Sequence, residues 1–374
     1  MHARAVRRQQ QRRARRHRRL ALVLGLALVA CFTVSLVETR PAQSPRAAPT
    51  LAPRRDRRVA HARPPKRPPQ YVVVSFDGAG GTALWEYWRS VARRVQAHFT
   101  FFVSGVYLLD VSRRRHYHPP RHEAGSSDIG FAQPQGDLTA PGTLDQIAAG
   151  YVEGHEIGTH YNGHFCAPYP GSVGEWSAAD WRQELTQFDR LLFGAGQLPF
   201  GPREIVGGRT PCLQGKLRTL YPVLAARGFR YDASQVARLG DWPKREQGIW
   251  SVPLLEIPFV GHTFRVVSMD YNFMVNQTGG DAHVERQTYL SLRRAFRVTY
   301  DGNRAPLSVA NHFETWHDGA YNRALERFLL ESCGLQEVRC VSFRELVDWL
   351  DALPRRALRR FRAGKFPKLR IYRR

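Results

Sequence analysis

Asp77 lies at the point where an apolar run of the sequence ends in glycines. The run YVVVSF, residues 71–76, has the β-branched and aromatic composition of a buried strand, and Gly78 follows the aspartate directly. One role for such an aspartate is to cap the next helix. In parallel α/β barrels, however, functional groups lie where strands end, which favours a functional carboxylate at Asp77.

A histidine pair is the second group that could carry chemistry. His160 and His164 belong to the stretch GHEIGTHYNGH, residues 154–164, and are four residues apart. On one helical turn both imidazoles would face the same way, a spacing that suits a divalent metal. The alternative is a chance pair on a surface. A zincin motif is excluded because three residues, not two, separate Glu156 from His160.

Strand-like and helix-like runs alternate along the middle of the chain. This alternation predicts a parallel α/β fold, and we expect a (β/α) barrel of about seven units. The polar stretch 106–141 is expected to be a long insertion over one rim. The expected strands are 71–76, 99–105, 203–208, 251–258, 264–271 and 306–313, and the expected helices are 83–98, 143–152, 178–193, 283–300 and 322–332.

The positive charge of the chain, +24 in total, lies at its two ends. Residues 1–70 hold 18 Lys or Arg against 2 Asp or Glu, and residues 355–374 hold 10 Lys or Arg and no acid. Residues 71–354, with 28 basic and 30 acidic side chains, are near neutral. This balance is typical of one large globular domain and argues against nucleic-acid binding. Residues 355–374 are expected to form a solvated basic tail.

The N-terminal segment has the pattern of a membrane anchor. Nine arginines precede an uncharged run at 20–37, which as a helix would span roughly 27 Å. The arginines predict a cytoplasmic segment 1–19, a single span, and an extracytoplasmic domain at the cell membrane. A cleaved signal peptide and a lipoprotein lipidated at Cys31 are the competing hypotheses, but the length of the run favours an uncleaved anchor. Residues 38–70 are expected to be a disordered Pro- and Arg-rich linker.

Four cysteines fall in the predicted exported domain, and an even number there suggests two disulfides. Four cysteines allow three pairings. The most economical joins Cys333 to Cys340 and Cys166 to Cys212.

Five short motifs, taken in order, resemble the NodB-homology polysaccharide deacetylases (carbohydrate esterase family 4), with the chitin-deacetylase-like branch as the nearest in character. The resemblance covers roughly residues 71–353 and implies a distorted barrel and metal-dependent removal of N-acetyl groups from a GlcNAc-containing cell-wall or chitin-like polysaccharide. Each motif is weak alone, whereas five in order are a strong signal. The motifs are SFDG at 75–78, THYNGH at 159–164, RTPC at 209–212, YDAS at 231–234 and a Leu-x-x-x-x-His ending at His312.

The resemblance implies a role for each matching residue. Asp77 corresponds to the general base, and His160 and His164 correspond to the histidines that bind a divalent metal such as zinc or cobalt. Arg209 corresponds to the arginine that orients the base through an ion pair.

The acid half of the site is implied in the same way. His312 corresponds to the general acid that protonates the departing amine, and Asp232 to the carboxylate that keeps His312 charged. Trp250 is a candidate for lining the acetyl pocket, with a place in the core as its alternative.

Gly78 departs from the family pattern, which has a second aspartate there as the third metal ligand. Three hypotheses stay open: Asp77 swings to ligate the metal, water or another carboxylate such as Asp128 fills the gap, or the site binds metal poorly or not at all. Two functions follow. One is a membrane-anchored polysaccharide deacetylase. The other is a catalytically impaired, deacetylase-like protein that binds glycan in the same groove.

Overall fold

The computed structural model describes residues 66–194 and 198–367. Within these ranges no helix is both long enough and apolar enough to span a membrane. The predicted membrane helix 20–37, the segment 1–19 and most of the linker 38–70 lie outside the described residues. The anchor therefore stays a prediction.

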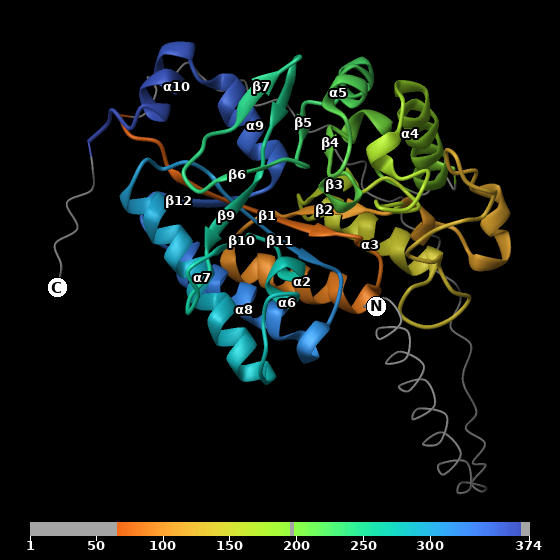
Figure 1. Ribbon diagram of the computed structural model, residues 1–374, viewed down its shortest axis with the longest axis horizontal. Coiled ribbons are helices and arrows are strands. Elements are labelled where there is room, and N and C mark those ends of the chain that lie inside the picture. Colours follow the sequence, from red (N-terminus) through yellow and green to blue (C-terminus); the bar gives the residue numbers. More distant parts are fainter. Residues whose placement is uncertain (1–65, 195–197, 368–374) are drawn as a thin grey trace, which may run out of the picture. The chain divides into compact units, whose positions relative to one another are not determined.

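A mostly parallel sheet forms the centre of the described structure (Figure 1). Its strands are short, and they are β1 Gln70–Asp77, β2 Thr100–Val103, β3 Glu156–Thr159, β4 Gly207–Gly208, β5 Tyr231–Asp232, β7 Lys244–Glu246, β8 Ile249–Ser251, β11 Leu307–His312 and β12 Val338–Val341. They follow the order β11-β1-β2-β3-β4-β5-β8-β7, with β12 also paired to β1 and only β7 antiparallel to its neighbour. The predicted α/β class is confirmed.

The strand order runs from β11 to β7 with no pairing between these two ends, so the described strands do not close the expected distorted barrel. A separate three-stranded sheet, in the order β10-β9-β6, lies beside β11. Its strands are β6 Val236–Arg238, β9 Leu254–Pro258 and β10 Arg265–Val267. Only Val252 and Pro253 separate β8 from β9, whereas a parallel crossover needs about a dozen residues. For this reason β9 cannot continue the main sheet as its next parallel strand.

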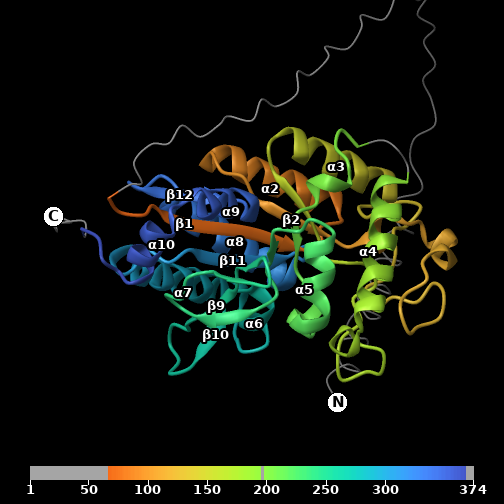
Figure 2. The ribbon, with the colours of Figure 1, turned by 90° about the horizontal axis from the view of Figure 1, so that it is seen from above.

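Helices pack around the sheet (Figures 1 and 2). The expected helices are confirmed: α4 begins and ends where the sequence predicts, α2, α3 and α7 differ by three residues or fewer at either end, and α8 begins six residues before the expected 322. A capping box of Ser177 and Asp180 starts α4, and Trp181, Leu185 and Phe188 bury one face of it. The longer helices are α2 Thr82–Val95, α3 Ala140–Val152, α4 Ala178–Phe193, α5 Leu217–Ala226, α7 Asp281–Asp301, α8 Trp316–Ser332 and α9 Phe343–Ala352.

The alternating side chains of β1 divide the core into two parts. Val72, Val74 and Phe76 belong to the larger apolar cluster, whereas Tyr71 and Val73 belong to a second cluster on the other face of the strand. This period of two is the one expected of a strand buried on both faces. Asp77 therefore points to the same side as Val73.

The expected basic tail is wrong for residues 355–362, which form helix α10, Arg355–Arg362. Ala357 and Phe361 of this helix are buried in the second apolar cluster, and the ring centroid of Phe361 lies 6.3 Å from that of Trp349. The arginines obscured an amphipathic pattern whose apolar positions are four apart. At the other end of the described chain Arg67 forms an ion pair with Glu337 at 2.6 Å, so the folded part begins before residue 70.

Both predicted disulfides are confirmed. Cys166 is bonded to Cys212, and Cys333 to Cys340. The first joins the segment after the histidine motif to the segment after Arg209, and the second closes the turn between α8 and β12.

Candidate active site

Strand pairing places Asp77 directly beside His312. The parallel ladder of β1 and β11 runs in register from Val72 opposite Leu307 to Asp77 opposite His312. The main chain continues the contact, because the Phe313 amide donates to the Asp77 carbonyl at 3.0 Å. Both strands end here, at the edge where parallel α/β proteins place their functional groups.

Arg209 forms the predicted ion pair with Asp77. Its Nη1 lies 2.7 Å from Oδ1 of Asp77 and 3.0 Å from Oγ of Ser75, and its Nε donates to the Ala233 carbonyl at 3.0 Å. Both charged side chains are buried, and the guanidinium lies 4.9 Å from the ring centroid of Phe102. Burial alone would raise the pKa of the Asp77 carboxyl, but the charge and hydrogen bond of Arg209, together with the nearby His160 and His312, outweigh burial and hold the pKa below its usual value.

The partner of His312 is Asp270, at the start of helix α6, Asp270–Met274. Oδ1 of Asp270 lies 2.7 Å from Nδ1 of His312, and Oδ2 accepts from the His312 main-chain amide at 2.8 Å. Burial lowers the pKa of His312, but the charge and hydrogen bond of Asp270, together with the charge of Asp77, more than compensate and raise it above the usual value for histidine.

The prediction that Asp232 supports His312 is therefore wrong. The Asp232 carboxylate accepts hydrogen bonds from Ser234 at 2.6 Å and from Tyr221 at 3.2 Å. Burial raises its pKa to about 6. Asp232 ends strand β5, which is several strands away from β11 in the sheet order, so its position in the sheet separates it from His312.

Sequence reasoning missed Asp270, although a signal was present. Asp270 is the next-to-last residue of the strand-like run 264–271, and Asp77 similarly lies at the end of an apolar run. The isolated bridge between Met269 and Ala310 then brings Asp270 beside β11.

His160 and His164 come together on a loop, not on a helical turn. Strand β3 ends at Thr159, and both Tyr161 and His164 adopt left-handed backbone conformations, each with φ of 60°. A continuous right-handed turn is therefore impossible, yet the two imidazole centroids lie only 5.1 Å apart. The predicted pair is correct, and the predicted helical geometry is wrong.

A buried carboxylate, Glu184 of α4, holds this loop. It accepts from the Asn162 amide at 3.0 Å and from the Tyr117 hydroxyl at 2.9 Å, and that hydroxyl in turn accepts from the Gly163 amide at 3.0 Å. Burial raises the pKa of Glu184 to about 7. Nothing in the spacing of Glu184 relative to the histidines indicated this contact.

The histidine pair fits a metal ion in its protonation and orientation. His160 donates from Nδ1 to the Arg209 carbonyl at 2.9 Å, which leaves Nε2 unprotonated, and Nε2 is buried without a hydrogen-bond partner. Such a bond to the far nitrogen is the usual support of a metal-binding histidine. Burial lowers the pKa of both imidazoles, that of His164 to about 3, so both stay neutral.

A third protein ligand is not in place among the described residues. Among the described residues, His164, Cys166 and Cys212 form the group of three possible ligands whose atoms lie within 4.8 Å of one another. The two sulfurs of this group are joined in the disulfide. Oδ1 of Asp77 is held by Arg209. Two imidazoles therefore need ligands from water or substrate to complete a metal site.

Gly78 explains the missing ligand. Its φ is +69°, and a Cβ added there would meet Tyr107 at an ordinary contact distance of 3.7 Å. A side chain would fit the space, although the backbone conformation favours glycine. Asp128, the carboxylate considered as a replacement, accepts from the Cys166 amide and does not line the pocket described next.

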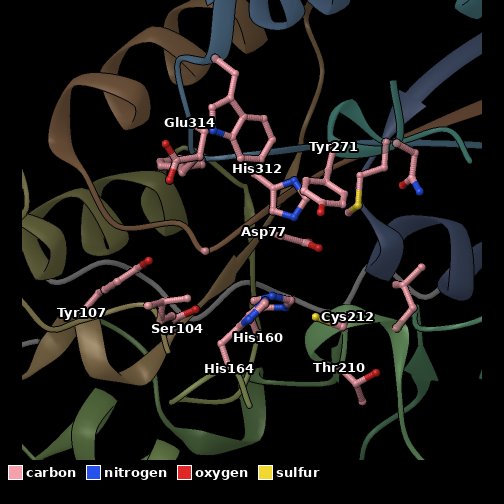
Figure 3. Close-up of a pocket in the computed structure, with 17 residues that line it drawn as sticks. Asp77, Ser104, Tyr107, His160, His164, Thr210, Cys212, Tyr271, His312 and Glu314 are labelled. Atoms are coloured by element: carbon pink, nitrogen blue, oxygen red, sulfur yellow. The ribbon is translucent and has the colours of Figure 1, made fainter. Parts of the chain in front are cut away.

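These groups surround one cavity of about 470 Å³, called here the Asp77 pocket. Figure 3 shows Asp77 and His312 on one side of it and His160 and His164 on the other. Its remaining lining is largely aromatic or apolar and includes Tyr107, Ile129, Leu213, Met269, Tyr271, Phe313 and Trp316, with Glu314 at the side. Tyr107 and Ile129 come from the predicted rim insertion.

Trp250 is not part of this pocket, so its assignment to the acetyl pocket is wrong. The ring is buried in the second apolar cluster, and its Nε1 donates to Asp351 at 2.8 Å. Trp316 lines the pocket, and its ring centroid lies 5.3 Å from that of His312.

Comparisons with known proteins give structural likenesses only. No family model and no curated protein matches the chain. A protein from Mycobacterium smegmatis named as a polysaccharide deacetylase has a TM-score of 0.48 and 16% identity, with 81% of this chain and 94% of that chain covered. A family 4 carbohydrate esterase from Streptomyces lividans has a TM-score of 0.37, 11% identity, and coverage of 72% and 91%.

A third likeness is to a pseudoenzyme of the same family from Bacillus anthracis, with a TM-score of 0.41, 10% identity, and coverage of 75% of this chain and 66% of that chain. The solved structures that this chain resembles thus include both enzymes and a pseudoenzyme.

Proposed function

We propose that the chain hydrolyses the N-acetyl groups of a GlcNAc-containing polysaccharide. The observation that carries this proposal is the pairing of Asp77 with His312 across one strand register, with a lowered carboxyl pKa and a raised imidazole pKa. The first shift favours an ionised carboxylate that accepts a proton, and the second favours a protonated imidazole that donates one. Amide hydrolysis needs both at once.

The reaction can be followed through these two side chains. The Asp77 carboxylate takes a proton from the water that attacks the acetyl carbonyl. The imidazolium of His312 gives a proton to the amide nitrogen as the C–N bond breaks. The products are acetate and the free amine of the sugar, and one water is consumed.

Other residues keep the two groups in their working states. Arg209 orients Asp77 and keeps it ionised, and Asp270 orients His312 and keeps it protonated. His160 and His164 would hold a divalent ion such as zinc or cobalt. That ion would polarise the acetyl carbonyl and make the attacking water more acidic.

The proposed setting of the reaction is outside the cytoplasm, with the domain held at the cell membrane by residues 20–37. The support for this is the arginine-flanked apolar run, together with two disulfides of the kind found in oxidising compartments.

Acetate release from N-acetylglucosamine oligomers, with and without added zinc or cobalt, tests the proposed reaction. We expect the wild type to release acetate and Asp77→Asn and His312→Gln to lose about 100-fold or more of the rate. Release by the wild type and both variants at the same rate would refute the proposal.

Glycan binding without hydrolysis is the second candidate function, and Gly78 favours it because the metal lacks a carboxylate ligand. Binding of the same oligomers with no acetate release at any metal concentration would select this function.

A further inference from the structure

Helix α10 carries arginines that the proposed reaction does not use. Residues 355–367 hold 6 Lys or Arg and no Asp or Glu. The apolar side chains of the helix are buried in the second apolar cluster, whereas Arg355, Arg356 and Arg359 are exposed. We call these three residues the Arg355 strip. The apolar side of α10 is therefore already covered by the domain, and the side that faces solvent is cationic.

No carboxylate neutralises the Arg355 strip. Its three arginines form no ion pair with any other residue that the structure describes. The last two carboxylates of the preceding helix α9, Asp348 and Asp351, are both paired with Arg230, and Asp351 is also paired with Arg245. The positive charge of the strip is thus available to a partner outside the domain.

The strip is unfavourable for the helix that carries it. Arg355 and Arg356 lie in the first turn, which has no acid, although the helix dipole favours negative charge there. Arg355 and Arg359 are four residues apart, and like charges at this spacing repel each other. Burial of Phe361 holds the helix in place despite these effects. Departures from local preference of this kind are typical of functional surfaces, and here the sign of the charge indicates an anionic partner.

Helix α10 lies where the chain enters the domain. Arg67 donates from Nη1 to the Pro367 carbonyl at 3.1 Å, and Arg360 donates from Nη2 to the Lys66 carbonyl at 3.4 Å. Figures 1 and 2 both show α10 at the same end of the domain as the start of β1. The segment that follows the proposed membrane anchor at 20–37 therefore joins the domain beside α10.

The Asp77 pocket lies at the opposite edge of the sheet. Strand β1 begins at Gln70, near α10, and ends at Asp77 in the pocket. At about 3.3 Å per residue these two ends are roughly 23 Å apart. A surface that binds α10 would therefore leave the pocket facing away from it.

We propose that the Arg355 strip binds the anionic phospholipid headgroups of a membrane and so directs the Asp77 pocket away from the bilayer. Guanidinium groups bind phosphate oxygens in a two-pronged geometry, which suits a phospholipid headgroup. The choice of lipid as the anion rests on the proposed membrane setting, because the tether joins the domain beside α10. The contact is electrostatic, since the apolar side of the helix is buried, and it should weaken with salt.

The test measures how close each edge of the domain lies to the bilayer. The full chain with Cys31→Ser receives a fluorophore at Ala363→Cys, just after α10, or at Ala124→Cys, in the segment 106–141 that partly lines the pocket; both positions are exposed. Each labelled chain is mixed with phosphatidylcholine vesicles that carry a headgroup nitroxide quencher, with or without about 30% phosphatidylglycerol. Circular dichroism checks the folding of every variant.

We expect phosphatidylglycerol to increase the quenching at Ala363→Cys and not at Ala124→Cys, and about 1 M salt to abolish the increase. One arginine near an anionic surface changes the ratio of docked to undocked domain about fivefold. Arg356→Gln should therefore lower this ratio about fivefold, and glutamine at all three positions of the strip should lower it roughly 100-fold.

The matched control replaces Arg113, Arg114 and Arg115 by glutamine. These arginines are exposed and lie in the segment 106–141, so the variant removes the same charge from a different part of the domain. It should leave the quenching at Ala363→Cys unchanged.

Three results would overturn the inference. The first is equal quenching at Ala363→Cys with and without phosphatidylglycerol. The second is an equal loss of quenching in the two triple variants, which would mean attraction by net charge alone. The third is binding of soluble polyphosphate through the strip with no lipid-dependent quenching, which would make the partner a polyanion in solution.

The proposed membrane setting is tested separately by flotation of the full chain with vesicles of phosphatidylcholine alone. Absence of flotation would refute the anchor at 20–37. Quenching at Ala363→Cys that depends on phosphatidylglycerol and on the strip would still support lipid binding by α10 in that case, so the two failures are distinguishable.

Discussion

Replacing Asp270 by asparagine should lower the pKa of His312 by about 2 units. The Asp270 side chain is 1% exposed and the His312 side chain 25% exposed, so water screens the pair only weakly. An opposite charge at contact distance shifts a pKa by about 1–3 units, and each unit corresponds to about 1.4 kcal/mol. The introduced asparagine could still accept a hydrogen bond, but it would carry no charge.

The sign of the effect follows from the two opposing influences on His312. In the wild type the Asp270 carboxylate outweighs burial, so the pKa lies above the usual value of 6.5. In Asp270→Asn burial dominates, and the pKa falls below that value. The proton donor is then lost at neutral pH, and the alkaline limb of the pH–rate profile moves to lower pH. Above both pKa values the protonated fraction, and the rate with it, should fall about 100-fold.

An NMR titration of the His312 imidazole measures this shift whether or not the protein is an active enzyme. Acetate release as a function of pH gives the same pKa from the rate. Asp232→Asn is the control, because Asp232 is also buried but makes its hydrogen bonds to Ser234 and Tyr221. The reasoning would be refuted by an unchanged His312 pKa in Asp270→Asn, or by an equal shift in Asp232→Asn.

Three further predictions concern the metal site and the fold. Gly78→Asp should tighten zinc binding by about tenfold or more, because it adds a carboxylate ligand where space exists; calorimetry showing equal or weaker binding would mean that Gly78 does not face the metal. Glu184→Gln should weaken zinc binding about tenfold, because it loosens the loop that carries His160 and His164. Gln183→Ala, at an exposed position of the same helix, should leave zinc binding unchanged. Unchanged zinc affinity in Glu184→Gln would mean that Glu184 does not position the two histidines. Phe361→Ala should lower the free energy of unfolding, measured by urea denaturation, by about 3–5 kcal/mol. Arg356→Ala, on the exposed face of α10, should change it by less than about 0.5 kcal/mol. Equal effects of the two substitutions would show that α10 does not pack on the domain.

Several features were readable from the sequence because their causes lie within a few neighbouring residues. The capping box of Ser177 and Asp180 and the spacing of apolar residues define α4 without reference to the rest of the chain. The apolar run of β1 and the glycine after it place Asp77 at a strand end. The motif order picked out the histidine pair and His312, which line one pocket with Asp77, and it picked out Arg209, which is buried against Asp77.

The partners of those residues were decided by the tertiary structure. Asp232 lies at the end of the short strand β5 and Asp270 lies near the end of the strand-like run 264–271, and local sequence does not show which of them reaches His312. Only the strand order, with β5 far from β11, and the bridge of Met269 to Ala310 assign Asp270 to His312. In the same way Trp250 and Trp316 are equivalent as aromatic residues, and packing alone places Trp316 in the pocket. A charge pair or a pocket wall depends on which distant segments the sheet register brings within a few ångströms, and that information is spread over the whole chain.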